Sequence, residues 1–299
     1  METRLLEYFL TVARERNITK SAELLHITQP TLSRQLVQLE DIMGQQLLIR
    51  DKKGLQLTEA GIMLQRRAEE IISLIEKTER ELKEDEDQLV GQLAIGTGET
   101  AVSFDFLPKV IEDYHAKYPQ VTYELYTGNA LLIKEKINQG LLDVGILLGA
   151  IDIESFDFIR LPYQDPWGLI VPINHSLAQK KFIEPNDLIG IPLFFNEKRS
   201  LVKNELKEWS KGNYDQYQII GGHNLISNIL AMVRHGIGCV ISIEGSILHQ
   251  DMSELKFIPL KPLITQGSVL VWKKNRIMSP MTKKFIALVK EKIIELEEI

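Results

Sequence analysis

Residues Gln29, Thr31, Ser33 and Arg34, within the stretch ITQPTLSRQLVQLE, carry side chains suited to chemistry on another molecule. A Gln side chain can hydrogen-bond adenine through two atoms, and an Arg side chain can bind guanine in the same way or pair with a phosphate. The small hydroxyl side chains of Thr and Ser permit close approach to a duplex. We therefore interpret these four residues as candidate contacts to DNA bases and phosphates.

The apolar spacing around these residues predicts the helix that positions them. Leu32, Leu36 and Leu39 follow the spacing i, i+4, i+7, so they form one narrow core-facing stripe. Pro30 fits the first turn, where backbone N–H groups have no helical partner to lose, and Thr28 is the expected N-cap.

Two shorter helical patterns precede this helix. NITKSAELLH, residues 17–26, predicts a helix capped by Thr19, and an earlier apolar repeat predicts a third amphipathic helix around Phe9. Three short helices with a tight turn before the last indicate a helix-turn-helix unit, whose last helix presents its N-terminal side chains to the major groove. The alternative is a helical hairpin whose polar face is only solvated.

A basic hairpin is predicted next. In LLIRDKKGLQLT, apolar and polar residues alternate on both sides of DKKG, where Gly can adopt a positive φ. The predicted turn carries Arg50, Lys52 and Lys53. A basic wing beside a recognition helix suits phosphate contact. The alternative is a solvated basic turn.

A long helix is predicted from Glu59, capped by Thr58, with an acidic hinge at residues 83–87. Its apolar or small positions repeat every seven residues: Leu64, Ala68, Ile71, Ile75, Thr78 and Leu82. Such a repeat is typical of a coiled-coil seam and predicts a dimer. The alternative is a helix that packs on the core of its own chain.

Composition places few limits on function. A chain of 299 residues with 44% hydrophobic and 25% charged residues suits two or three globular domains, and no stretch approaches the roughly 18 uncharged apolar residues of a membrane span. We therefore expect a cytoplasmic protein without membrane contact.

The net charge is −6, yet residues 1–58 hold eight basic against seven acidic side chains, so the net charge of the chain does not exclude a local DNA-binding face. The single cysteine, Cys239, is expected to be a buried thiol, and no metal site is expected.

In the second half, apolar strands alternate with helical stretches from Gln92, and this pattern restarts after Leu161. The alternation predicts two similar lobes with largely parallel sheets. Ligands bind beyond the carboxyl ends of such strands, where helix N-termini lie. The candidate ligand-binding residues there are Thr97, Glu99, Thr100, Gly128, Asn129, Asn196, His223 and Asn224.

Each of these candidates has an alternative role. Asn129 and Asn224 could simply cap helices, and His223 could be a surface turn residue. Paired helix N-termini favour a carboxylate-bearing metabolite, whereas Glu99 would repel one if it faced the cleft. A ligand with an anionic end and a cationic or hydroxyl-rich end would suit both observations.

An enzymatic alternative rests on GTGETA, residues 96–101, which fits the dinucleotide-binding pattern G-x-G-x-x-A, with Glu124 in the next strand. Glu124 is placed mid-strand, whereas the ribose-binding acid belongs at the strand end. Other catalytic motifs and catalytic residues are not found in the sequence. A nicotinamide-dependent oxidoreductase and a metabolite-binding protein that does not touch DNA are therefore the competing readings.

The chain resembles the LysR-type transcriptional regulators over essentially its whole length. The matching stretches are SAELLHITQPTLSRQLVQLEDIMG, QLLIR and LQLTEAG, followed more loosely by IGTGET, NQGLLDVGIL and VRHGIGCVIS. Ser21 and Leu48 depart from the family's usual Ala and Phe. The resemblance implies DNA contacts by Gln29, Pro30, Thr31, Ser33, Arg34 and Arg50.

The resemblance also implies an α/β architecture with four parts. These are a winged helix-turn-helix at 1–58, a dimerising linker helix and hinge at 59–90, and a two-lobed, periplasmic-binding-protein-like effector domain with lobes 91–162 plus 267–299 and 163–266. The expected partners are double-stranded DNA with an imperfect inverted repeat, a second copy of the chain, and a small-molecule effector, without a cofactor. A tetramer is also implied, and RNA polymerase is a candidate partner.

Overall fold

The computed structural model describes residues 2–51, 54–81, 89–149, 154–195 and 200–297. The chain divides into two compact units, Met1–Lys83 and Glu84–Ile299, which we call the N-terminal and C-terminal units. In the described part of the chain, no helix combines the length and the apolar character that crossing a membrane requires.

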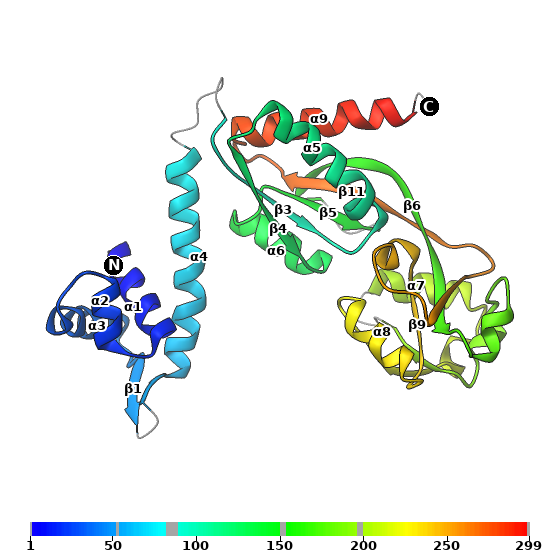
Figure 1. Ribbon diagram of the computed structural model, residues 1–299, viewed down its shortest axis with the longest axis horizontal. Coiled ribbons are helices and arrows are strands. Elements are labelled where there is room, and N and C mark those ends of the chain that lie inside the picture. The colour runs from blue at the N-terminus through cyan, green and yellow to red at the C-terminus, as the bar shows by residue number, and fades with distance from the viewer. Residues whose placement is uncertain (1, 52–53, 82–88, 150–153, 196–199, 298–299) are drawn as a thin grey trace. The chain divides into compact units, whose positions relative to one another are not determined.

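In its described residues, the N-terminal unit has four helices and one β-hairpin, whose arrangement is drawn in Figure 1. The elements are α1 (Thr3–Glu15), α2 (Ile18–Leu24), α3 (Gln29–Met43), the antiparallel pair β1 (Leu48–Asp51) and β2 (Gly54–Leu57), and α4 (Glu59–Glu81). Its core contains the predicted stripe of α3 together with apolar residues of α1 and α4: Leu5, Leu6, Phe9, Val12, Leu32, Leu36, Leu39 and Ala68. The predicted winged helix-turn-helix is confirmed.

Side-chain caps fix the starts of α2 and α3. Thr28 caps α3, because its hydroxyl accepts the Thr31 N–H at 3.4 Å, and Gly44 ends the helix at a φ of 63°. Thr19 does not cap α2, so that prediction was wrong. Asn17 has the extended backbone of an N-cap and accepts the Lys20 N–H at 3.0 Å, which places Thr19 inside the first turn.

The predicted seam of α4 is wrong in its first half. Leu64 and Ala68 pack into the N-terminal core, where Ala68 is fully buried, and α4 contacts α1. Ile71 remains exposed, and Leu82 lies outside the described residues. A seven-residue apolar repeat is required equally by a partner helix and by the chain's own core, so spacing alone could not separate them.

The C-terminal unit is built on a sheet whose strand order is β4-β3-β5-β11-β6-β9-β7-β8, with β10 paired to β6. The strands are β3 (Gly91–Thr97), β4 (Val121–Thr127), β5 (Val144–Leu148), β6 (Phe156–Pro172), β7 (Pro192–Phe194), β8 (Gln218–Gly221), β9 (Cys239–Ile243), β10 (Leu255–Pro259) and β11 (Thr265–Lys273). β3 is parallel to β4 and β5, and β7 is parallel to β8 and β9, as predicted.

We call the part around β3, β4 and β5 lobe 1, and the part around β7, β8, β9 and β10 lobe 2. In lobe 1, α5 (Leu107–Lys117) and α9 (Pro280–Glu297) lie side by side, and α6 (Ala130–Gln139) packs through Ile133 and Ile137 into a separate core (Figure 1). Lobe 2 carries α7 (Ser200–Trp209) and α8 (Ser227–Arg234). The long strands β6 and β11 pair with each other and run through both lobes.

Short helical turns connect several of these elements. A π-helical turn, η1 (Val102–Phe106), leads from β3 towards α5. In lobe 2 the turns are η2 (Ser176–Gln179), η3 (Pro185–Leu188), η4 (Tyr214–Gln216) and η5 (Glu244–Ile247).

Candidate functional site

The outward face of α3 collects the polar residues expected to contact DNA. Pro30, Thr31 and Arg34 are exposed, while Gln29 and Ser33 are half-buried. Gln29 Nε2 donates to Ser33 Oγ at 2.8 Å, so these two side chains support one another on successive turns. The first two turns therefore form one polar surface opposite the buried leucine stripe of the same helix.

The wing is attached to α3 by a carboxylate that the sequence did not reveal. Glu40 Oε1, near the end of α3, accepts the backbone N–H groups of Leu47 at 2.7 Å and Leu48 at 3.0 Å. These amides lead directly into β1, which contains Arg50. Lys52 and Lys53 lie outside the described residues.

The start of α4 is also tied to the wing. Thr58 caps α4 as predicted, because its hydroxyl accepts the Gly61 N–H at 2.9 Å, and the same hydroxyl donates to the Gln46 carbonyl at 2.7 Å. A Cβ added at Gly61 would lie 2.2 Å from the Leu47 carbonyl oxygen, so only glycine permits this close approach.

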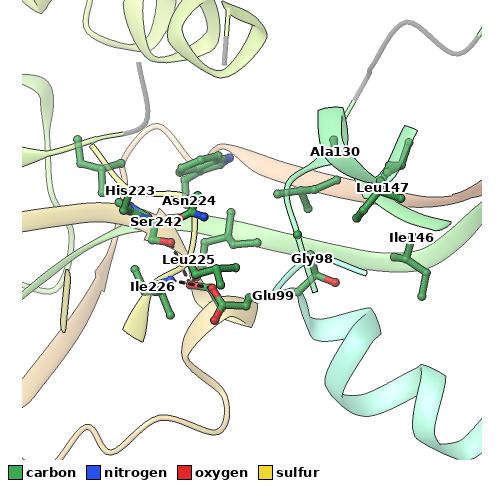
Figure 2. Close-up of a pocket in the computed structure, with 18 of the residues that line it drawn as sticks. Gly98, Glu99, Ala130, Ile146, Leu147, His223, Asn224, Leu225, Ile226 and Ser242 are labelled. Carbon is green, nitrogen blue, oxygen red and sulfur yellow. Dashed lines mark hydrogen bonds between the residues drawn. The ribbon is translucent and has the colours of Figure 1, made fainter. Parts of the chain in front are cut away.

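The C-terminal unit contains a cavity of about 70 Å³ between its lobes. Figure 2 shows residues of lobe 1, such as Gly98, on one side and residues of lobe 2, such as Asn224, on the other. The polar side chains of the lining are Glu99, Thr100, His223, Asn224, Ser242 and Ser246, and Trp167 and Phe195 contribute aromatic surface.

Five of the eight predicted ligand-binding residues line this cavity: Glu99, Thr100, Gly128, His223 and Asn224. Thr97 and Asn129 do not line it. The hydroxyl of Thr97 hydrogen-bonds Ser103, and Asn129 caps α6 by accepting the Leu132 N–H at 3.0 Å. Asn196 lies outside the described residues.

Glu99 bridges the cavity from lobe 1 to lobe 2. Its Oε2 accepts the Ile226 N–H at 2.7 Å, and Ile226 directly precedes α8 (Figure 2). Burial raises the pKa of the Glu99 carboxyl, and the hydrogen bond from Ile226 offsets only part of this effect. The carboxylate therefore occupies a helix N-terminus of the opposite lobe.

A second carboxylate, Asp165 of β6, was missed by sequence reasoning. It is 2% exposed and accepts the Ala101 N–H at 3.2 Å. Desolvation raises its pKa, hydrogen bonds from the Ala101 and Gly245 backbone oppose that shift, and the charges of Glu244 and Asp105 add to it. A single Asp within the run YQDPWG gives no local sign of such burial.

Cys239 is a buried thiol, as expected. Its side chain is in the core of lobe 2, and desolvation raises its pKa to about 11. This thiol is not poised to act as a nucleophile, because the thiolate is the reactive form. Within the described ranges, no cluster of three or more His, Cys, Asp or Glu could hold a metal ion.

The dinucleotide pattern has a packing explanation. A Cβ at Gly96 would lie 2.7 Å from side-chain carbons of both Ile133 and Leu142, so this glycine lets α6 approach the sheet. Glu124 pairs with Ala94 in the middle of β4, away from the carboxyl end where a ribose would bind.

Two family models match the chain. One, described as a bacterial regulatory helix-turn-helix protein of the lysR family, matches residues 3–62, and the other, described as a LysR substrate binding domain, matches residues 86–293. The Hca operon transcriptional activator HcaR of Escherichia coli (strain K12) is 30% identical over 302 residues, which cover 98% of both chains.

Solved structures share the fold. CbnR, a LysR family transcriptional regulator, aligns with a TM-score of 0.75 at 20% identity, covering 98% of this chain and 99% of that one. Full-length CbnR complexed with its target DNA aligns with a TM-score of 0.73 at 21% identity, covering 97% and 99%.

Proposed function

The chain belongs to the LysR family of bacterial transcriptional regulators, and we propose that it binds an imperfect inverted repeat of DNA as a homodimer whose activity is set by a small-molecule effector. The observation that carries the DNA-binding part is the polar outer face of α3 in a matched helix-turn-helix unit. In such units the recognition helix enters the major groove with its N-terminal residues at the base edges.

The DNA contacts that we propose come from the first turns of α3 and from the wing. They are Gln29, Pro30, Thr31, Ser33, Arg34, Arg50, Lys52 and Lys53. Arg34 is an exposed cation on the recognition helix, so it is the strongest candidate for a bidentate contact with guanine or for a phosphate contact.

The second copy of the chain is proposed to bind along α4. Met63, Ile71 and Leu74 remain exposed beside the face that packs on α1, with exposed fractions of 62%, 38% and 39%. These apolar side chains share one face of α4 with the ion pair of Arg67 and Glu70, and we propose that a partner covers this mixed face. Further assembly to a tetramer, contact with RNA polymerase, and a cytoplasmic location are parts of the same proposal.

The effector is proposed to bind in the cavity between the lobes, in contact with Glu99, Thr100, Gly128, His223 and Asn224. Thr97, Asn129 and Asn196 were also proposed from the sequence, but Thr97 and Asn129 are not among the lining residues and Asn196 lies outside the described residues. A carboxylate on the ligand would meet the N-terminus of α6, since Gly128 and Ala130 line the cavity. We propose no cofactor and no enzymatic activity. The proposed domains are 1–58, 59–90, 91–162 plus 267–299, and 163–266.

The test is fluorescence anisotropy on labelled DNA from upstream of the protein's own gene. Arg34→Ala should weaken specific binding by roughly ten- to a hundredfold, because one good bidentate contact contributes about 1–3 kcal/mol of discrimination. Arg4→Ala is the matched control, since Arg4 is exposed and pairs only with the neighbouring Glu2 among the described ion pairs.

Two results would count against this proposal. Unchanged affinity of Arg34→Ala would remove Arg34 from the DNA contacts. A wild-type protein that leaves every duplex unbound at moderate salt would instead favour a metabolite-binding protein without a DNA partner.

A further inference from the structure

We propose that the effector cavity selects a ligand with a positively charged nitrogen, and that Glu99 is the residue that binds this nitrogen. The inference rests on the proposed function only in taking the cavity between the lobes as the effector site. It adds the chemical class of the group that the site recognises.

The charge of the lining is the first observation. Within the described part of the chain, the residues that line the cavity include no Lys and no Arg, whereas Glu99 contributes a carboxylate. Among the described lining residues, His223 is the one side chain that could become a cation. An anionic head group placed against Glu99 would therefore meet a like charge without a permanent counter-charge in the lining.

The second observation is that Glu99 already fills the place an anion would take. Helix N-termini attract anions through their free N–H groups, and the N–H of Ile226, at the start of α8, is bound by Glu99 Oε2 at 2.7 Å. Figure 2 shows the Glu99 side chain reaching from lobe 1 to this amide. A ligand carboxylate at α8 would have to displace a carboxylate that is covalently part of the protein.

The third observation is that Glu99 retains capacity for a ligand. An ionised carboxylate offers about four acceptor sites, and one backbone N–H occupies one of them. Burial raises the pKa of this carboxyl despite the bond from Ile226, so its charge is incompletely compensated in the protein alone. A cationic donor would supply the missing compensation through a charge-assisted hydrogen bond.

Aromatic surface in the same cavity points to the same class of ligand. Trp167 and Phe195 both line it, with ring centroids 6.4 Å apart in an edge-to-face arrangement. Aromatic faces attract ammonium and guanidinium groups, and this attraction is stronger where water is excluded. Ser246 donates its hydroxyl hydrogen to the Ile243 carbonyl, so Ser242 donates to Ser246, and the oxygen of Ser242 can accept a further N–H donor.

The experiment measures binding of matched small probes to the full-length protein. Propylammonium, 1-propanol, propionate and butane-1,4-diammonium are titrated by calorimetry at equal ionic strength and at pH about 8, where an ordinary imidazole is neutral. The ammonium probes should bind the wild-type protein more tightly than the alcohol or the carboxylate. In Glu99→Gln their affinity should fall roughly ten- to a hundredfold, since hydrogen bonds to charged groups contribute about 1.5–3 kcal/mol.

Glu124→Gln is the matched control, because Glu124 is exposed on β4, outside the cavity lining, and the same charge is removed. It should bind the ammonium probes like the wild-type protein. The proposal is overturned if neither ammonium probe binds, if propionate binds more tightly than propylammonium, or if Glu99→Gln binds the ammonium probes as tightly as the wild-type protein does.

DNA binding separates this inference from the proposed function. Anisotropy on the upstream DNA is recorded for each variant, and the control variant Glu124→Gln should bind DNA like the wild-type protein in the absence of probes. A protein that binds DNA but shows no preference for ammonium probes would refute the inference alone, whereas a protein that binds no DNA would refute the proposed function.

Discussion

At the scale of single residues, carboxylates that are partly or fully buried hold separate parts of each unit together by accepting backbone N–H groups. Glu40 does so in the N-terminal unit, where one oxygen accepts two amides at the start of the wing, one of them from the buried Leu47. A donor that loses its acceptor inside a protein costs more free energy than the bond itself contributes. The position of the wing relative to α3 therefore depends on this side chain.

Glu40→Ala should lower the free energy of unfolding by about 1–3 kcal/mol, because one buried amide is left without an acceptor. Glu40→Gln should be milder, since it keeps an acceptor oxygen. Urea unfolding measures the stability, and anisotropy should show weaker DNA binding as the wing loses its attachment. Glu23→Ala, on the exposed side of α2, is the control, and an equal effect of both alanine variants would contradict the proposed role of Glu40.

Single-residue roles could be predicted only where the partner is close in sequence. The cap of α3 by Thr28 was predictable, because the amide that it binds is three residues away. The partner of Glu99 is 127 residues away, and that of Asp165 is 64 residues away, so both depend on the tertiary fold. The error at Thr19 arose because Asn17 competes for the same role nearby and has the required backbone conformation.

At the scale of elements, α4 presents apolar residues both to the N-terminal core and to the second copy of the chain that we propose. Leu64 and Ala68 pack into the N-terminal core, while Met63, Ile71 and Leu74 stay exposed along an adjacent strip. The seven-residue repeat in the sequence of α4 is apolar, as predicted, but its first two members, Leu64 and Ala68, pack in the core of the N-terminal unit. The exposed strip is then the surface that we propose for the second copy of the chain.

Leu74→Lys should weaken self-association by roughly seven- to fiftyfold. Full burial of a Leu side chain contributes about 1.5–3 kcal/mol, Leu74 is 39% exposed in the single chain, and a two-fold interface loses two such contributions. Sedimentation equilibrium measures this change. Ser73→Lys introduces the same charge at an exposed neighbouring position and should associate like the wild-type protein. A dimer of unchanged affinity in Leu74→Lys would place the interface elsewhere.

At the scale of the whole C-terminal unit, two continuous strands join the lobes. The boundaries predicted at 162–163 and 266–267 fall inside β6 and β11, because each of these strands contributes one end to each lobe. The alternation of strands and helices was sufficient to predict parallel pairing within the lobes. It did not locate the crossing point, because β6 and β11 are each continuous through it and have no turn there. The burial of β6 does change along its length: Asp157, Phe158 and Arg160 are exposed, whereas residues 167–171 are all buried.

Asp165 lies on β6 where the strand passes between the lobes, and its carboxylate contacts the backbone of Ala101 in lobe 1 and of Gly245 in lobe 2. Burial in this position raises its pKa above the value of an unfolded chain, with Glu244 and Asp105 acting in the same direction. The folded protein therefore binds this proton more readily than the unfolded chain does. The resulting stability is complete below the unfolded pKa and is lost as pH rises through the folded pKa.

Asp165→Asn should remove this pH dependence, because the side chain can no longer ionise. As the pH rises above about 3.9, the ordinary pKa of an aspartate side chain, the free energy of unfolding of the wild-type protein should fall more steeply than that of Asp165→Asn, because the folded-state pKa is raised. Urea unfolding at a series of pH values measures both slopes. Asp157→Asn, on the exposed part of the same strand, is the control and should keep the wild-type slope. Equal slopes in all three proteins would show that Asp165 does not titrate in the pH range measured, and that other contacts hold the two lobes together where β6 passes between them.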